Sequence, residues 1–388
     1  MNFTKLLTAL TLGASFTALA APCPTRASWP TTDWPTAGVT NKAAEVKALE
    51  DYAFRTIGTE RQRFGIRTDG MVIVKGGNII FEKYARGWSA KNRHLSWSVA
   101  KSISSALIGV AVQKGALSLD DSICKYLTGY EGKPICSTKV KNFITFSPGL
   151  QWQENYEDQG YQGSSVISML LGVGHRDQLG FVLSQSQQAA PGTQFNYSTG
   201  FAHVAGALAK AALKPGYGND AFWDLLFTKI GMTHTTFEED PKGNPLGGSY
   251  VYAPVREFAK FGYLFLNDGC WAGERLLPEN WVAQSTTPND TFRAAPQGAV
   301  PSGYMWWLNQ PAKADAAKPY KDLPADTYIA IGHWGQYVVV IPSLDLVITR
   351  VGDDRVDCPA SAVDGKVDGI ECDLSLNKLT ALAIEVAK

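Results

Sequence analysis

The spacing Ser-x-x-Lys, which can pair a nucleophile with a base, occurs three times in the chain: Ser98 with Lys101, Ser122 with Lys125, and Ser375 with Lys378. On a helix, residues three apart share a face, so the hydroxyl and the amine can meet. A lysine removed from water loses its proton more readily and can then activate the serine. Only Ser98 opens an apolar, helix-periodic segment, 98–114, whereas Ser122 reads as an exposed loop residue and Ser375 as a helix cap. This context favours Ser98 and Lys101.

Two further segments carry groups that such a serine would need. The turn-rich stretch 191–200 presents Tyr197, which could pass a proton to a leaving group. The stretch 331–336 joins two expected strands, and the backbone N–H of Gln336 could form an oxyanion hole with the N–H of Ser98. Each segment also has a plainer interpretation, as a packed turn around Tyr197 and as a β-bulge with a structural His333.

The expected elements place strands at both ends of the chain and helices in its middle. Apolar runs around 71–81 flank a Gly-Gly turn and predict a hairpin, and three more β-rich runs lie at 327–331, 337–341 and 346–351. Helical periodicity is expected over 42–55, 98–114, 201–213, 256–266 and 376–386. We therefore predict an α+β fold, in which one antiparallel sheet is formed from both ends of the chain and flanked by helices. The sheet domain would comprise 41–115 and 241–388, with a mostly helical inserted domain at 116–240.

The N-terminus has the pattern of an export signal. Lys5 precedes an apolar run, Leu6–Ala20, which ends in Ala-Leu-Ala, so residues 1–20 are expected to be removed on export to the periplasm or outside the cell. Six cysteines in an exported chain suggest disulfides, and six allow 15 pairings. Two pairs would close short polar loops and leave a third: Cys124 with Cys136, Cys358 with Cys372, and Cys23 with Cys270.

Composition and missing motifs exclude several classes of function. The 36 basic and 36 acidic side chains of the 388 residues give no net field for nucleic acid, and no second apolar run predicts a membrane span. The chain lacks the Gly-x-Ser-x-Gly, His-Glu-x-x-His and phosphate-loop motifs. Its five histidines are dispersed, so neither a metal nor a cofactor is expected. The sequence carries no signal for an oligomeric state.

Taken in order, the segments Ser98–Lys101, Tyr197–Thr199 and His333–Gly335 resemble the three motifs of the serine β-lactamase and penicillin-binding superfamily. The pattern is most similar to its class C branch, and within that to 6-aminohexanoate-dimer hydrolases and related esterases. The resemblance spans roughly residues 65–352. It implies that Ser98 is acylated, that Lys101 is the base, that Tyr197 protonates the leaving group, and that the N–H groups of Ser98 and Gln336 form the oxyanion hole.

Departures from the family motifs bear on the substrate. Thr199 stands where β-lactamases and DD-peptidases have asparagine, and His333 replaces a lysine that attracts the substrate carboxylate. Because a histidine near neutral pH is mostly uncharged, the site is expected to have lost part of its attraction for carboxylates. With Trp334 and Gly335, and with Trp306 and Trp307 as an apolar wall, the site would suit small amides or esters with an apolar acyl part. The resemblance also implies that the loop carrying Trp152, Glu154 and Tyr156 borders the cleft, unless it is a solvated loop.

Three interpretations of function follow. The first is an exported serine hydrolase that cleaves small amides or esters through an acyl-enzyme on Ser98. The second is a β-lactamase or D-alanyl-D-alanine carboxypeptidase, which Thr199 and His333 disfavour. The third is a binding protein on the same fold that holds a peptidoglycan fragment or a carbohydrate without turnover.

Overall fold

The structure is a computed structural model that describes residues 22–156, 163–294, 300–311, 313, 316–359, 361–367 and 369–388. The expected export signal, residues 1–20, lies outside these ranges. Within them, every helix is too short or too polar to cross a bilayer.

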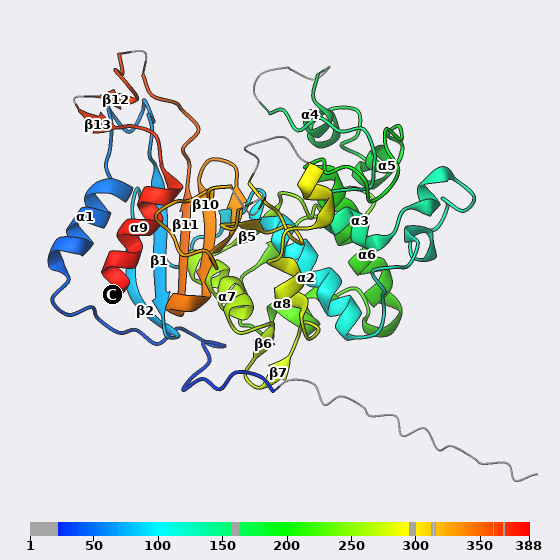
Figure 1. Cartoon of the computed structure of the whole chain (residues 1–388), viewed down its shortest axis with the longest axis horizontal. Helices are drawn as coiled ribbons and strands as arrows, with labels where there is room; N and C mark the ends of the chain where they lie inside the picture. Colours follow the sequence, from blue (N-terminus) through cyan, green and yellow to red (C-terminus); the bar gives the residue numbers. More distant parts are fainter. Residues whose placement is uncertain are drawn as a thin grey trace, which may run out of the picture.

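A six-stranded antiparallel sheet is built from both ends of the chain (Figure 1). Its order is β2-β1-β11-β10-β9-β8. The strands span β1 Thr68–Lys75, β2 Asn78–Tyr84, β8 Trp307–Leu308, β9 Tyr328–Gly332, β10 Gln336–Ile341 and β11 Leu346–Gly352. The antiparallel sheet from both termini, which the distribution of apolar runs predicted, is confirmed.

The central strands are buried on both faces, which explains why their sequences read as continuous apolar runs. In β10, Val338 and Val340 point to one core, whereas Val339 and Ile341 point to the other. Helix α7 (Val255–Leu266) covers the first face, and α1 (Ala43–Ala53) and α9 (Leu376–Ala387) cover the second (Figure 1).

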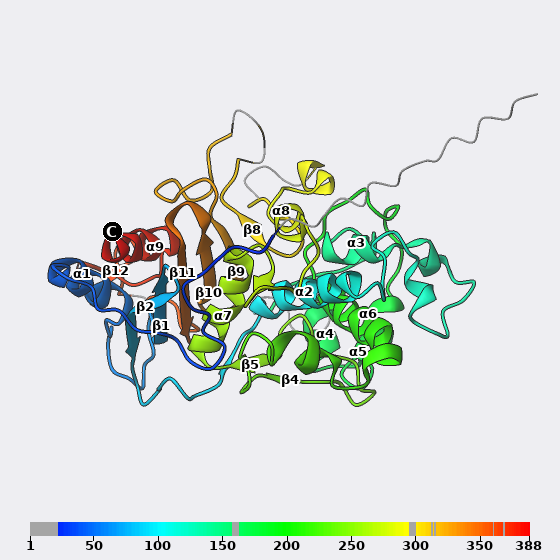
Figure 2. The same ribbon diagram turned by 90° about the horizontal axis from the view of Figure 1, so that it is seen from below.

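The other half of the molecule is mostly helical (Figure 2). Its helices are α2 Val99–Gln113, α3 Val140–Ile144, α4 Ser165–Leu170, α5 Gln178–Leu183 and α6 Thr199–Tyr217. Helix α2 packs along α6 and also contacts β9, so it connects the helical half to the sheet. Because α2 is apolar almost all round, residues 99–111 are buried without a gap.

Smaller elements complete the fold. Strands β3 (His94–Leu95), β5 (Val251–Ala253) and β4 (Thr236–Phe237) form a three-stranded antiparallel sheet beside the start of α2. The remaining pieces are the hairpin of β6 Cys270–Trp271 with β7 Glu274–Arg275, helix α8 Trp281–Ser285, and the hairpin of β12 Lys366–Val367 with β13 Ile370–Glu371. Short helical turns lie at Ile123–Lys125, Pro134–Ser137, Trp223–Phe227, Asp290–Ala294 and Pro342–Leu344.

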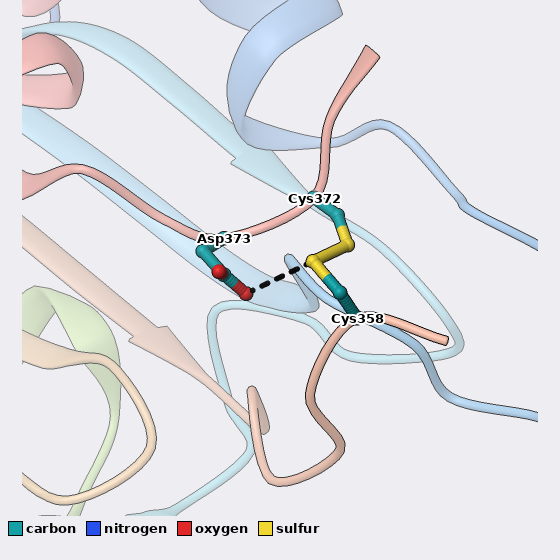
Figure 3. Close-up of side chains that lie close together, drawn as sticks. All are labelled: Cys358, Cys372 and Asp373. Atoms are coloured by element: carbon teal, nitrogen blue, oxygen red, sulfur yellow. Dashed lines mark hydrogen bonds between the residues drawn. A yellow bond between two sulfur atoms is a disulfide. The ribbon is translucent and has the colours of Figure 1, made fainter. Parts of the chain in front are cut away.

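The structure joins the six cysteines in three disulfides, Cys23–Cys270, Cys124–Cys136 and Cys358–Cys372. The Cys358 and Cys372 sulfurs lie near the Asp373 carboxylate, and this is the one cluster among the described residues with metal-ligand spacing (Figure 3). Because the two sulfurs are bonded to each other, neither is a thiolate that could hold a metal.

The contact between α7 and the sheet depends on Gly262. A Cβ at this position would lie 2.8 Å from methyl groups of both Val338 and Val347. We predict that Gly262→Ala lowers the free energy of unfolding by about 1–3 kcal/mol, despite the better helix propensity of alanine. Urea denaturation of the purified chain measures this change.

Gly216 in α6 is the matched control, because an added Cβ there would meet nothing within 4 Å. Gly216→Ala should leave stability unchanged or raise it by about 0.4–1 kcal/mol. Equal effects of the two substitutions would show that α7 is not in such close contact with β10 and β11.

Candidate active site

Ser98 is positioned by the short strand that precedes it. Strand β3 pairs with β5, and the Ser96 hydroxyl donates to the Ser249 carbonyl at 3.1 Å. Trp97 then adopts a left-handed backbone with φ of 45°, a conformation that is strained for a bulky side chain. The chain therefore turns sharply into α2, and Ser98 stands at the N-cap of this helix. The first N–H groups of the helix donate to the carbonyls three residues earlier, as the Ala100 N–H does to Trp97 at 3.0 Å.

Lys101 lies one helical turn after Ser98, and its side chain is directed at the Ser98 hydroxyl. The Nζ atom is 2.8 Å from Ser98 Oγ, 2.8 Å from Thr199 Oγ1 and 2.9 Å from the Gly248 carbonyl oxygen. The residue is only 2% exposed. A neutral amine has two N–H donors and one lone pair, so it can donate to Thr199 and Gly248 while it accepts the proton of Ser98.

Burial lowers the pKa of Lys101 from 10.5 to about 8, because the charged form is deprived of water. The negative charge of Glu154 opposes this effect and raises the pKa of Lys101. The amine therefore exchanges its proton close to neutral pH, as a general base must.

The other two Ser-x-x-Lys pairs do not form such a contact. Ser122 Oγ donates to the Cys136 carbonyl and accepts the Cys124 N–H, while Ser375 caps α9 through the Lys378 N–H. Lys125 and Lys378 are exposed and form ion pairs with carboxylates. The preference for Ser98 over the other two serines agrees with this difference in burial.

Tyr197 lies in the loop before α6 and is close to both Lys101 and Ser98. The Ser198 hydroxyl caps α6, and the Asn196 N–H donates to the Phe146 carbonyl at 2.7 Å, which fixes both sides of Tyr197. Lys101 Nζ lies 4.9 Å from the centre of the tyrosine ring. Burial, and then the charge of Glu154, raise the pKa of Tyr197 well above 10, although a hydrogen bond with Ser98 acts in the opposite direction. The phenol therefore stays protonated when Lys101 has lost its proton.

Glu154 connects to Lys101 through Thr199. The Thr199 hydroxyl donates to one oxygen of the carboxylate, and the Thr199 N–H donates to the other at 2.9 Å. The Trp152 indole N–H donates to the same carboxylate at 2.6 Å, and the Tyr156 hydroxyl lies 3.2 Å from Thr199 Oγ1. Thr199 thus bridges the Glu154 carboxylate to the Lys101 amine.

His203 is part of this network, although it belongs to no recognisable sequence motif. It lies one turn after Thr199 on α6 and is 1% exposed. Its Nδ1 accepts the Gly248 N–H at 3.0 Å, and the carbonyl of Gly248 accepts from Lys101. Burial, and then the charge of Lys101, lower the pKa of His203 to about 3, so it stays a neutral acceptor.

A pocket of about 580 Å³ opens in front of Ser98, and we call it the Ser98 pocket. Its walls are mainly apolar and aromatic, and Glu154 is the one charged residue among the described lining residues. The rings of Tyr156 and His333 stack at 5.0 Å and form one side. The lining residues are Ser98, Glu154, Tyr156, Phe195, Tyr197, Phe292, Val300, Trp307, Ile331, Gly332 and His333.

Several residues expected at the substrate are located elsewhere. Trp152 is buried beneath Glu154, and Trp306 packs on Phe261 and Phe265 in the core, so only Trp307 forms the expected aromatic wall. Trp334 has φ of 57° in the three-residue turn between β9 and β10, and its side chain lines a different pocket. In the same turn, the Gly335 carbonyl accepts from Arg350 at 2.7 Å.

Gln336 begins β10 and lies opposite Gly332 in the ladder. Its side chain is turned away from the Ser98 pocket and bonds both the carbonyl and the N–H of Gly352. The role of its backbone N–H in an oxyanion hole stays a prediction.

The known proteins that this chain resembles include 6-aminohexanoate-dimer hydrolases and class C beta-lactamases. A 6-aminohexanoate-dimer hydrolase from Paenarthrobacter ureafaciens is 22% identical over 339 residues, which cover 82% of this chain and 82% of that protein. A solved structure from Bacillus anthracis, provisionally named a 6-aminohexanoate-dimer hydrolase, matches with a TM-score of 0.67 at 16% identity, over 95% of this chain and 90% of its own. A class C beta-lactamase solved with cefoxitin matches with a TM-score of 0.59 at 14% identity, over 89% of this chain and 99% of its own.

These likenesses show the fold that the sequence resemblance implied. The profile of the beta-lactamase family matches residues 53–356, a range that includes Ser98, Lys101, Tyr197 and His333. The chain belongs to the beta-lactamase family of serine hydrolases.

Proposed function

We propose that the chain is an exported serine hydrolase that cleaves small amides or esters through an acyl-enzyme on Ser98. The observation that carries this proposal is the buried amine of Lys101, held 2.8 Å from the Ser98 hydroxyl oxygen. The three disulfides suit an oxidising compartment, which supports export.

In the first half of the reaction, Lys101 accepts the proton of Ser98, and the serine oxygen attacks the substrate carbonyl carbon. Tyr197, whose phenol is protonated, donates its proton to the leaving nitrogen or oxygen and regains one from the Lys101 ammonium. The acyl group is then an ester on Ser98. In the second half, Lys101, neutral again, accepts a proton from water, and the water oxygen attacks the carbonyl carbon of this ester. The bond to the Ser98 oxygen breaks, the acid is released, and the proton taken from water passes from Lys101 to Ser98.

The Ser98 pocket supports a substrate with an apolar acyl part. Phe195, Phe292 and Trp307 line it, and neither an arginine nor a lysine is among the described lining residues. The one charge on its wall is the Glu154 carboxylate, which would attract an amine rather than a carboxylate. An amide or ester of a linear amino acid, the class that the name of the Paenarthrobacter relative indicates, fits these properties.

The alternatives have less support. A β-lactamase or DD-carboxypeptidase binds a substrate carboxylate, and His333 and Thr199 replace the residues that the family uses near it. A binding protein without turnover has no need of a lysine buried against a serine, since burial of an amine is unfavourable unless it serves a purpose.

Ser98→Ala should reduce hydrolysis by at least about a thousandfold, because it removes the nucleophile. A panel of p-nitrophenyl esters, linear amides, lactams, lactones and β-lactams measures this loss and the preferred class together. Ser122→Ala is the matched control and should retain full activity. Equal activity of Ser98→Ala and the parent chain would refute the acyl-enzyme, and saturable binding of the panel without product would favour the binding protein.

Acylation should rise with pH, because only the neutral form of Lys101 can accept a proton. We predict that kcat/KM increases nearly tenfold per unit below a pKa of about 8 and levels off above it. Glu154→Gln removes the charge that raises the pKa of Lys101, so the rise should move to lower pH. Initial rates on a p-nitrophenyl ester from pH 5.5 to 9.5, with Ser98→Ala as the blank, test both statements. A flat profile would contradict the assignment of Lys101 as the base.

His203→Leu should lower kcat/KM by more than about tenfold, because the Gly248 N–H loses its acceptor and its carbonyl is no longer held toward Lys101. Since that carbonyl stabilises the ammonium, the pH profile should also move to lower pH. His203→Gln keeps an acceptor and should restore much of the activity. If both variants fold, lose activity equally and keep the parent pH profile, His203 does not position the base.

A further inference from the structure

A second pocket lies directly behind the wall of the Ser98 pocket. It has a volume of about 380 Å³, and we call it the arginine pocket because Arg63, Arg67, Arg86 and Arg355 line it. It shares its wall with the Ser98 pocket through adjacent residues. Trp97, which precedes Ser98, and Trp334, which follows His333, both face the arginine pocket.

The arginine pocket carries an excess of positive charge. Four guanidinium groups face two carboxylates, Asp69 and Asp353, and Asp353 is shared by Arg63 and Arg355. Asp69 bonds Arg86 at 3.1 Å and also faces His94 Nε2 at 3.3 Å. Arg67 is paired with a carboxylate outside the pocket wall, that of Glu60, at 2.8 Å. The four guanidinium groups are therefore balanced by three carboxylates, which leaves an excess of one positive charge.

Two of the arginines have capacity to bind an acceptor. The Nε atoms of Arg63 and Arg67 are buried and make no hydrogen bond to any residue that the structure describes. Burial lowers the pKa of Arg63 first, and repulsion by the positive charges of Arg355, Arg67 and Arg86 lowers it further, against the attraction of Asp69. An anion between them would relieve this repulsion and accept hydrogen bonds.

The rest of the wall is aromatic. The rings of Trp97 and Trp334 lie 5.0 Å apart, Trp88 lies 4.7 Å from His94, and the guanidinium carbon of Arg355 lies 4.5 Å from the centre of the Trp334 ring. Indole faces of this kind pack against planar organic groups.

The backbone around the pocket is held in an unusual conformation. Arg63, Arg86, Trp97 and Trp334 all have a positive φ, between 45° and 58°. Such strain in bulky residues is typical of ligand-binding and active sites.

We propose that the arginine pocket binds a small aromatic carboxylate, with its carboxylate between the guanidinium groups and its ring against the tryptophans. The proposal goes beyond the hydrolysis at Ser98 and does not depend on it. A ligand in this pocket would contact the residues next to Ser98 and His333, so it would lie against the back of the active site.

The test uses the full mature chain with Ser98→Ala, which prevents turnover, and benzoate as the probe. Benzyl alcohol has the same ring without the charge. Isothermal titration should show saturable binding of benzoate at least fivefold tighter than that of benzyl alcohol. Indole N–H signals in NMR, assigned with Trp88→Phe, should report the ligand at Trp88.

Arg355→Gln should weaken benzoate binding at least fivefold. This side chain is 44% exposed, so the variant should fold, and an unchanged melting temperature checks that it does. Arg61→Gln is the matched control, because it removes the same charge from an exposed position outside the pocket. Trp88→Ala provides a second test and should weaken the binding of benzoate but not that of acetate.

Three results would overturn the proposal. They are binding of benzyl alcohol as tight as that of benzoate, an equal loss of benzoate affinity in Arg61→Gln and Arg355→Gln, and no change in the Trp88 signal when benzoate is added. Any one of these results excludes an aromatic carboxylate site here, whatever the activity of Ser98 proves to be.

Discussion

The candidate active site depends on the burial of the Lys101 amine, which is unfavourable because it deprives the charged form of water. A lysine side chain is stable in such a place only if the surrounding groups pair with its amine. Thr199 and Gly248 accept hydrogen bonds from it in either form, and Ser98 accepts from the ammonium and donates to the neutral amine. The same burial lowers the pKa of the amine to about 8, which is the property that its proposed role as a base requires.

Three separate stretches of the chain supply the groups around Lys101. Ser98 is the N-cap of α2, Thr199 and His203 lie on α6, and Gly248 lies in the segment before β5. The central strands β1 and β11 are buried on both faces, which allows the sheet to act as a rigid support. Glu154 is the balancing charge, because it keeps the pKa of Lys101 from falling further.

Much of this arrangement could be predicted from the sequence, for identifiable reasons. Strands buried on both faces leave long apolar runs, and the apolar surroundings of Lys101 distinguished it from Lys125 and Lys378, which are exposed. Local pattern could not reveal which way a side chain turns. The left-handed backbone of Trp334 sends its ring to the arginine pocket, and Trp152 is buried under Glu154. His203 and Gly248 have no motif, since their role arises from contacts between segments 45 residues apart.

The protonation state of Lys101 is the central claim, and it can be measured directly on the resting enzyme. The full mature chain labelled with 13C at the lysine Cε positions would be titrated by NMR, with the Lys101 signal assigned by its loss in Lys101→Arg. The account predicts a single titration with a pKa of about 8, well separated from the exposed lysines. A Lys101 signal that titrates near 10.5 with the others would contradict it, because the neutral fraction of the amine at pH 7 would then be below about one in a thousand, instead of about one in ten.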